Sequence, residues 1–323
     1  MKPYPKFTRI CSIGLYTCLL IGLFAAPLGV ISRALDKMPQ GELAYVTCSR
    51  QNQYQGGDLQ RFDLTDGTSH PLTNDGAEYA QPTWSPDGTR LMFRVKIKGE
   101  NRIQVMDAEG DNRHTLAVGT APAWSPDGRM IAYAAPLPIK GEQAPRYALY
   151  VMDADGQNQT RISGPEFVNV SDPTWSPDGK VILFAARSAE EGGVDLYQIA
   201  PDGAAPERLT HSPDVSESHP AFSPDGQWIA FSANDGVFIS VYRMAVHGSE
   251  PELLTWRGYN VRSFDPTWSP DGQYLAFWMQ TIFSHHDDVP PDPEGIYLIK
   301  LDGGQPSLII PNGCDPAWRP SHK

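Results

Sequence analysis

A seven-residue segment that recurs along the chain constrains the fold more than any other feature. Residues Pro82 to Gly88 read Pro-Thr-Trp-Ser-Pro-Asp-Gly, and close copies occupy residues 122–128, 173–179, 220–226 and 266–272. A shortened sixth copy runs from Pro316 to Pro320. The aromatic residues of the six copies are separated by 40, 51, 47, 46 and 50 residues. A period of this length suits a repeat built from four short strands.

The residues around each motif predict a four-stranded antiparallel unit. The stretch that ends in the aromatic residue is expected to be the innermost strand. Ser-Pro-Asp-Gly is expected to form a reverse turn, because Pro fixes φ and Gly accepts a positive φ. Apolar second and third strands follow, as at residues 90–93 and 103–106, and the fourth strand often ends in Leu-Thr. Radial repetition of such units predicts an all-β fold, a six-bladed β-propeller of four-stranded antiparallel blades.

The Pro-x-Trp-Ser-Pro-Asp-Gly motif with the Leu-Thr ending resembles the TolB-like β-propeller repeat. The resemblance covers about residues 41–320. It is specific for the fold and weak for function, because the motif is a turn. Proteins of the TolB type carry an α/β domain before the propeller, and about eight residues separate the apolar N-terminal segment from the first expected strand. We therefore expect that domain to be missing here, and the resemblance implies an interaction role in the cell envelope.

The two ends of the repeat array predict how the ring closes. The last motif supplies an innermost strand without successors, and residues 42–47 look like a second strand without a predecessor. One blade is therefore expected to be shared between residues 41–73 and 314–320. Cys48 and Cys314 fall near each other in that alignment, within the separation that a disulfide needs. The sequence predicts a disulfide between them, and the alternative is two unrelated buried thiols.

The N-terminus differs from the rest of the chain. Lys2, Lys6 and Arg9 precede the stretch from Ile10 to Ser32, which is 23 residues without a charge. About 20 apolar residues cross a bilayer, and positive flanks stay in the cytoplasm. Residues 1–35 are therefore expected to be a transmembrane signal-anchor helix, with residues 36–323 as the propeller outside the cytoplasmic membrane, periplasmic or at the cell surface. A cleaved signal peptide, which would leave a soluble exported protein, is the alternative.

Charge argues against nucleic acid as a partner. The formal net charge is −12, and the N-terminal segment through Arg33 contributes four positive charges, so the remaining chain carries −16. An acidic body repels phosphate backbones. We expect no nucleic-acid partner, and membrane contact only through the N-terminal helix.

Strand direction divides the expected loops between two faces. The Ser-Pro-Asp-Gly turns and the third-to-fourth strand turns share one face, here called the turn face. The connections between blades and between second and third strands share the other, here called the variable face. Its loops differ in length, and variable loops on a rigid frame often carry function.

The residue before each motif proline is expected at the channel mouth on the variable face. These residues are Gln81, Ala121, Asp172, His219, Asp265 and Asp315. Three carboxylates and a histidine around one opening could bind a cation or a basic group of a partner. The alternative is that they cap strand entry or are solvated. Of the six, all but Ala121 are binding candidates.

No motif indicates catalysis. The chain has no G-x-S-x-G nucleophile elbow and no H-E-x-x-H zinc helix. The segment from His285 to Asp288 has metal-binding residue types, but its proline-rich flank favours a solvated loop. His211 and His219 bracket one loop and make neither a triad nor a ligand set. We expect no catalytic residue, no resident metal and no cofactor.

The sequence thus favours a non-enzymatic binding or scaffold module of the cell envelope, with a protein or peptide as partner. The alternative is a propeller lyase or hydrolase that acts on an envelope or extracellular carbohydrate. In that case His219 and the mouth carboxylates would work with a divalent metal.

Overall fold

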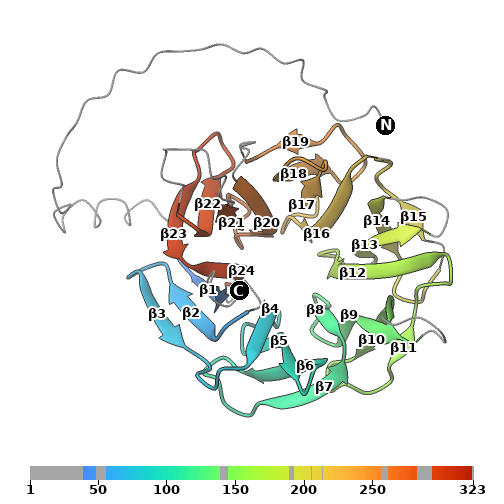
Figure 1. Cartoon of the computed structure of the whole chain (residues 1–323), viewed down its shortest axis with the longest axis horizontal. Helices are drawn as coiled ribbons and strands as arrows, with labels where there is room; N and C mark the ends of the chain where they lie inside the picture. Colours follow the sequence, from blue (N-terminus) through green and yellow to red (C-terminus); the bar gives the residue numbers. More distant parts are fainter. Residues whose placement is uncertain are drawn as a thin grey trace.

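The computed structural model describes residues 39–48, 56–138, 145–188, 193–204, 206–212, 214–255, 261–281 and 293–321. Within these ranges the chain forms 24 β-strands and no helix. Figure 1 shows the strands in small sheets arranged around a common centre. The predicted all-β class is confirmed.

Each sheet repeats one antiparallel pattern, which the second repeat illustrates. It contains β4 (Glu78–Trp84), β5 (Arg90–Ile97), β6 (Glu100–Asp107) and β7 (His114–Val118), paired in that order. Four strands joined by short antiparallel turns are typical of a propeller blade. The first strand lies nearest the centre in Figure 1.

Four further groups have the same order. They are β8 (Thr120–Trp124), β9 (Met130–Leu137), β10 (Arg146–Asp153) and β11 (Thr160–Arg161); β12 (Phe167–Trp175), β13 (Ile182–Ser188), β14 (Val194–Ile199) and β15 (Glu207–Arg208); β16 (Ser216–Phe222), β17 (Trp228–Asn234), β18 (Ile239–Ala245) and β19 (Glu252–Leu253); and β20 (Val261–Trp268), β21 (Tyr274–Thr281), β22 (Gly295–Lys300) and β23 (Ser307–Pro311). The last two groups form one eight-stranded sheet, because Ile239 and Arg262 make a single parallel bridge between them.

The remaining group joins the two ends of the described chain. Its order is β24 (Gly313–Trp318), β1 (Glu42–Thr47), β2 (Leu59–Asp63) and β3 (Thr68–Pro71). Leu43 pairs with Trp318, and Val46 pairs with Cys314 across a register shift. This is the pairing expected of a unit shared between the termini, and we call it the closing unit.

The Ser-Pro-Asp-Gly segments form the expected turns. In the first copy Ser85 Oγ donates to Asp87 Oδ1 at 2.5 Å and accepts from the Arg90 N–H at 2.9 Å. The Gly88 N–H donates to the Ser85 carbonyl at 2.8 Å, and Gly88 has φ of 66°. The Ser–Asp bond recurs at 2.5 to 2.7 Å in the other four complete copies. The turn therefore satisfies its own polar groups.

The hydroxyl that follows the fourth strand explains the Leu-Thr ending. Thr73 Oγ1 accepts a hydrogen bond from the Leu59 N–H at 2.9 Å, 14 residues earlier on the third strand. Ser163, Thr210 and Thr255 make the same bond, also over 14 residues. A buried backbone donor at the blade edge is satisfied in this way.

Apolar side chains fill the space between neighbouring units. One cluster combines Leu59 of the closing unit with Tyr79, Trp84 and Phe93 of the next. The motif tryptophans Trp84, Trp124, Trp175, Trp268 and Trp318 are 5 to 7% exposed. The motif tryptophans therefore pack the sheets against one another near the turn face.

The predicted N-terminal anchor, residues 1–35, lies outside the described residues. No helix among the described residues is long and apolar enough to cross a bilayer.

Candidate functional site

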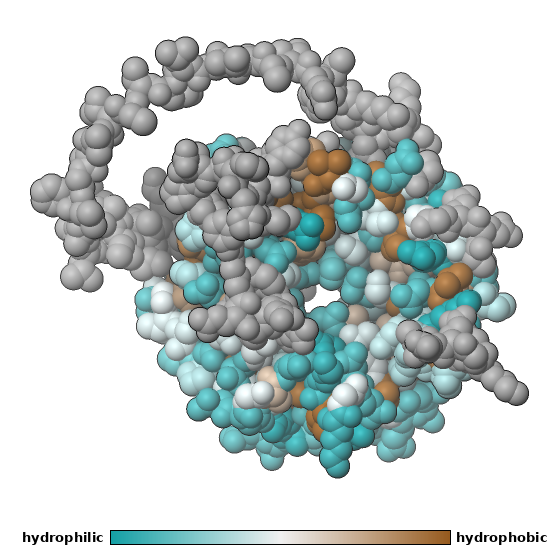
Figure 2. All heavy atoms as spheres, in the orientation of Figure 1, coloured by the Kyte–Doolittle hydropathy of each residue, from teal (hydrophilic) through white to brown (hydrophobic). Residues whose placement is uncertain are grey.

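A cavity of 710 Å³ occupies the centre of the molecule. All six expected channel-mouth residues line it, together with the proline that follows each of them. Gly99 and Asn101 beside the β5–β6 turn and Glu78 at the start of β4 also line it, and these lie on the variable face. Figure 2 shows the hollow at the centre of the molecule. The site therefore opens on the face whose loops vary.

The six channel-mouth residues share a backbone conformation that sequence reasoning missed. Each has φ between 49° and 53°, although none is glycine. The strand register shifts beside each of them, as between Ala80 and Thr83 on β4. A non-glycine residue in this region is uncommon and strained, and such positions often occur at binding sites. The bulge turns these residues toward the centre.

Some of these side chains join neighbouring units. The Gln81 N–H donates to Asp315 Oδ2 at 2.8 Å, and the Ala121 N–H donates to Gln81 Oε1 at 2.9 Å. The His219 N–H lies 3.4 Å from Asp172 Oδ2. A side chain from one unit thus accepts from the strained backbone of the next. This favours the strand-capping interpretation for Gln81. Asp172 and Asp315 accept a backbone hydrogen bond in the same way and also contribute charge to the cavity.

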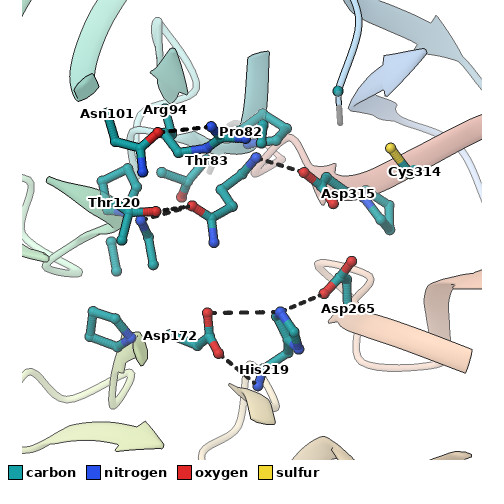
Figure 3. A pocket seen from close by; sticks show the side chains of 18 of the residues that line it. Pro82, Thr83, Arg94, Asn101, Thr120, Asp172, His219, Asp265, Cys314 and Asp315 are labelled. Carbon is teal, nitrogen blue, oxygen red and sulfur yellow. Dashed lines mark hydrogen bonds and ion pairs between the residues drawn. The ribbon is translucent and has the colours of Figure 1, made fainter. Parts of the chain in front are cut away.

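The charged residues form an ion-pair cluster on one side of the cavity (Figure 3). His219 Nε2 lies 2.9 Å from Asp265 Oδ1 and 3.8 Å from Asp172 Oδ1. Burial alone lowers the pKa of His219, but the charges of Asp172, Asp265 and Asp315 outweigh it and raise this pKa to about 10. His219 is therefore an imidazolium at neutral pH.

The pKa values of Asp315 and Asp265 are shifted in opposite directions, although the charge of His219 acts to lower both. Burial raises the pKa of Asp315, and repulsion from Asp265 adds to it, so that the pKa is about 7. Burial also acts to raise the pKa of Asp265, but the charge of His219 and the hydrogen bonds with His219 and Asp315 together outweigh it and hold this pKa below its usual value. At neutral pH the cluster thus contains one firmly ionised pair, His219 with Asp265, and one carboxyl that is partly protonated.

This protonation state bears on the possible metal site. A histidine that binds a metal must be neutral, and His219 holds its proton. In the parts of the chain that the structure describes, no group of three or more histidine, cysteine or acidic residues is arranged to hold a metal ion. The His285 to Asp288 segment lies outside the described residues, and His211 is exposed and is not among the residues that line the cavity.

Arg94 and Trp278 are among the cavity-lining residues that the sequence interpretation did not select. Both occupy the second strand, ten residues after the motif aromatic. The equivalent residues in the other units are Ala134, Ala185, Ser232 and, by pairing, Val46, all with 0% exposure. The sequence did contain a signal for these two residues. Each is large or charged at a position that holds a small or apolar residue in the other units.

The predicted cysteine pair lies at the edge of the cavity. Cys48 and Cys314 form a disulfide, with a Cα–Cα distance of 5.8 Å. The two residues are diagonal neighbours, because Cys314 pairs with Val46 and the Cys48 N–H donates to the Asn312 carbonyl. Cys314 also lines the cavity, directly before Asp315.

Sequence comparison gives similarities to an uncharacterized peptidase and to a TolB homolog. The chain is 28% identical over 124 residues to the uncharacterized peptidase YuxL of Bacillus subtilis, covering 35% of this chain and 18% of that protein. It is 29% identical over 138 residues to the TolB homolog of Chlorobium chlorochromatii, covering 42% of this chain and 30% of that protein. The matches thus span less than a third of either relative.

Solved structures agree on the fold. TolB from Acinetobacter baumannii superposes with a TM-score of 0.68 at 20% identity, covering 90% of this chain and 70% of that one. An oligogalacturonate lyase in complex with manganese superposes with a TM-score of 0.52 at 16% identity, covering 79% and 70%. At these identities the likeness shows a shared fold.

The family assignment rests on most of the chain. The family described as the TolB beta propeller domain matches residues 38–176 and 166–287. These segments contain the five complete Ser-Pro-Asp-Gly turns and five of the six channel-mouth residues. The chain therefore belongs to the TolB β-propeller family.

Proposed function

We propose that the chain is a six-bladed propeller outside the cytoplasmic membrane, and that it acts as a non-enzymatic module that binds a protein or peptide over its central cavity. The observation that carries the proposal is the 710 Å³ cavity, which opens on the variable face and is lined by charged side chains from several units. Rigid concave sites with a few converging polar groups are typical binding sites.

The strand pairing supports a count of six blades. Five four-stranded groups follow one another along the chain, and the closing unit supplies the sixth. The eight-stranded sheet counts as two blades, because one bridge between Ile239 and Arg262 is its sole connection among the described strands.

The disulfide supports a location outside the cytoplasm, and the position of the first strand suggests how the propeller would face there. The Cys48–Cys314 disulfide suits an oxidising compartment. An anchor at residues 10–32 would join the propeller at its turn face, because β1 begins there and Pro39 to Glu42 lie beside the turn at Ser269 to Asp271. The variable face would then point away from the membrane, toward partners in the envelope.

Site-specific photocrosslinking tests the proposed face. A photoreactive residue replaces Lys98 on the variable face or Asp111 in the β6–β7 turn on the turn face; both positions are exposed and belong to the same unit. We expect covalent adducts with an envelope protein or peptide from position 98 and none from position 111. Equal adducts from both positions, or adducts from position 111 alone, would contradict the proposal.

An enzyme of the lyase or hydrolase class is the second candidate. The similarity to a peptidase and to the fold of a lyase supports this candidate. The position of His219 between the carboxylates of Asp172 and Asp265 also supports it. The raised pKa of His219 weighs against a metal ligand or a general base at neutral pH. Metal analysis of the purified protein separates the candidates. Stoichiometric manganese or zinc that disappears in His219→Gln would favour the enzyme.

A further inference from the structure

We propose that Arg94 makes the central cavity a carboxylate-recognition site, so that the bound partner presents a carboxylate group to it. This inference rests on the proposed binding function and names the chemistry of the partner. It adds an anionic contact to a site in which the sequence indicated only cation binding.

The surroundings of Arg94 leave most of its hydrogen-bonding capacity unused. Its Nη1 donates to Asn101 Oδ1 at 3.1 Å, and within the described part of the chain this is its one hydrogen bond. A guanidinium carries five N–H donors. Figure 3 shows Arg94 and Asn101 together at one side of the cavity, across from the His219 cluster. A half-buried arginine with four remaining donors is suited to an anionic ligand.

The nearest carboxylates of the protein are already engaged. Burial lowers the pKa of the Arg94 guanidinium, and the charges of Asp315 and Glu78 offset part of that effect, which places both carboxylates in its neighbourhood. Glu78 pairs with Lys96 at 3.0 Å, and Asp315 accepts from the Gln81 N–H. Among the described residues no ion pair joins Arg94 to either of them. The charge of Arg94 is thus balanced only at a distance.

The repeat shows that the fold does not require a charge at this position. Ala134, Ala185 and Ser232 stand at the equivalent place and are fully buried. Burial of a guanidinium without a carboxylate costs free energy. A position that could hold alanine, as in two other units, carries instead a costly side chain that lines a cavity. A ligand carboxylate would offset this cost and use the parallel donors of the guanidinium.

Trp278 adds an apolar element to the same cavity. It occupies the equivalent position in the β20–β23 unit and packs on Phe264, with ring centroids 5.1 Å apart. Arg94 and Trp278 belong to the two units that flank the closing unit. A ligand that places a carboxylate at Arg94 and an apolar group at Trp278 would span the closing unit. A peptide offers both groups.

Affinity selection with the full-length protein in detergent tests the inference. The probes are three pools of N-acetylated random hexapeptides. The first has a free C-terminal carboxylate and no Asp or Glu, the second is amidated with one Asp or Glu, and the third is amidated without acidic residues. We expect at least one carboxylate pool to be retained about tenfold more than the neutral pool, in line with a charged hydrogen bond in a partly desolvated site.

Variants assign the effect to Arg94. Arg94→Ala, which introduces the residue of two other units, should abolish the preference, and Arg94→Lys should retain part of it. Arg102→Ala is the matched control, because it removes an arginine from β6 of the same unit that pairs with Glu100 outside the cavity. Thermal unfolding verifies that each variant is folded, and if Arg94→Ala is not, Arg94→Lys and Arg94→Gln decide the question.

The outcomes separate this inference from the proposed function. Retention of peptides without a carboxylate preference, or a preference unchanged in Arg94→Ala, overturns the carboxylate site and leaves the binding module in place. Retention of no peptide by the unmodified protein removes peptide binding at the cavity, and the carboxylate site with it.

Discussion

The turn face and the cavity are built from the same six repeats. They differ in where their polar groups find hydrogen-bond partners. On the turn face each Ser-Pro-Asp-Gly segment bonds to itself within five residues, as between Ser85 and Arg90. In the cavity several side chains have their partner in the next unit, as between Asp315 and Gln81, which are 234 residues apart. Self-contained groups recur almost unchanged through this chain, whereas groups that depend on other units differ from copy to copy. The second kind is where a ligand can replace a protein partner.

The closing unit departs from the repeat on both faces. On the cavity side it carries the Cys48–Cys314 disulfide. On the turn side Arg319 stands where complete motifs have serine, donates to the Gly88 carbonyl at 2.9 Å, forms an ion pair with Glu42, and lies 4.8 Å above the Trp84 ring. The ring is thus fastened at its junction by a covalent bond on one face and by an arginine on the other.

Removal of the disulfide should have the largest effect. The double variant Cys48→Ser, Cys314→Ser frees a loop of 266 residues, and the loop-entropy relation gives a loss of up to about 5 kcal/mol in the free energy of unfolding. Urea unfolding of the full-length protein, with and without reductant, measures it. Reductant should lower the stability of the unmodified protein and leave the double variant unchanged. A loss below about 1 kcal/mol would show that the strand pairing of β24 with β1 closes the ring without help.

Replacement of Arg319 should have the next largest effect. Arg319→Ser restores the residue of the complete motifs but removes a charged hydrogen bond, an ion pair and a cation–π contact, at a cost of about 2 kcal/mol. Arg243→Ser is a matched control. Arg243 also lies 4.8 Å above a tryptophan ring and pairs with a glutamate, Glu252 at 2.7 Å, and its exposed fraction is nearly equal. It does not join the chain ends. If the two variants lose equal free energy of unfolding, the contacts of Arg319 contribute no more at the ring closure than the same contacts contribute within one unit.

The same contrast explains how much the sequence predicted. The fold followed from local chemistry, because Pro, Gly and the Ser–Asp bond define each turn within a few residues and the period gives the strands. The pairing of Cys48 with Cys314 followed by alignment of repeats. The channel-mouth residues were placed correctly because each directly precedes a motif proline.

The contents of the site could not be predicted in the same way. The left-handed conformation of Gln81 or Asp265 arises from a bulge in strand pairing. The neighbouring residues in the sequence do not predict this bulge. The protonation of His219 depends on carboxylates from three other units. Arg94 is visible in the sequence as a departure from alanine, but its relation to the cavity needs the curvature of the ring.

Asp315→Asn should change how stability depends on pH. The folded pKa of Asp315, about 7, lies above the ordinary value of 3.8, so its contribution to stability is greatest below pH 3.8 and is lost as pH rises to about 7. Asparagine keeps an acceptor for the Gln81 N–H and removes the charge. We expect the variant to lose this decline and to gain on the order of 1 kcal/mol at pH 8, after allowance for screening. Thermal unfolding between pH 4 and 8 measures it, and an unchanged decline would exclude Asp315 as its source.

Asp87→Asn should have the smallest effect, and the opposite sign. The hydrogen bonds from Ser85 and from the Thr89 N–H hold the pKa of Asp87 at about 2, below the ordinary 3.8. The contribution of Asp87 to stability is therefore present above pH 3.8 and is lost as pH falls toward 2. Asp315 in the cavity has the opposite effect, because its protonation adds stability as pH falls from 7 to 4. Because Asp87 is exposed, we expect a loss of roughly 0.5 kcal/mol at pH 6, absent at pH 2. Unfolding of the variant at both values measures it. A loss that persists at pH 2 would assign the effect to turn geometry, and the two faces would then not differ in their response to acid.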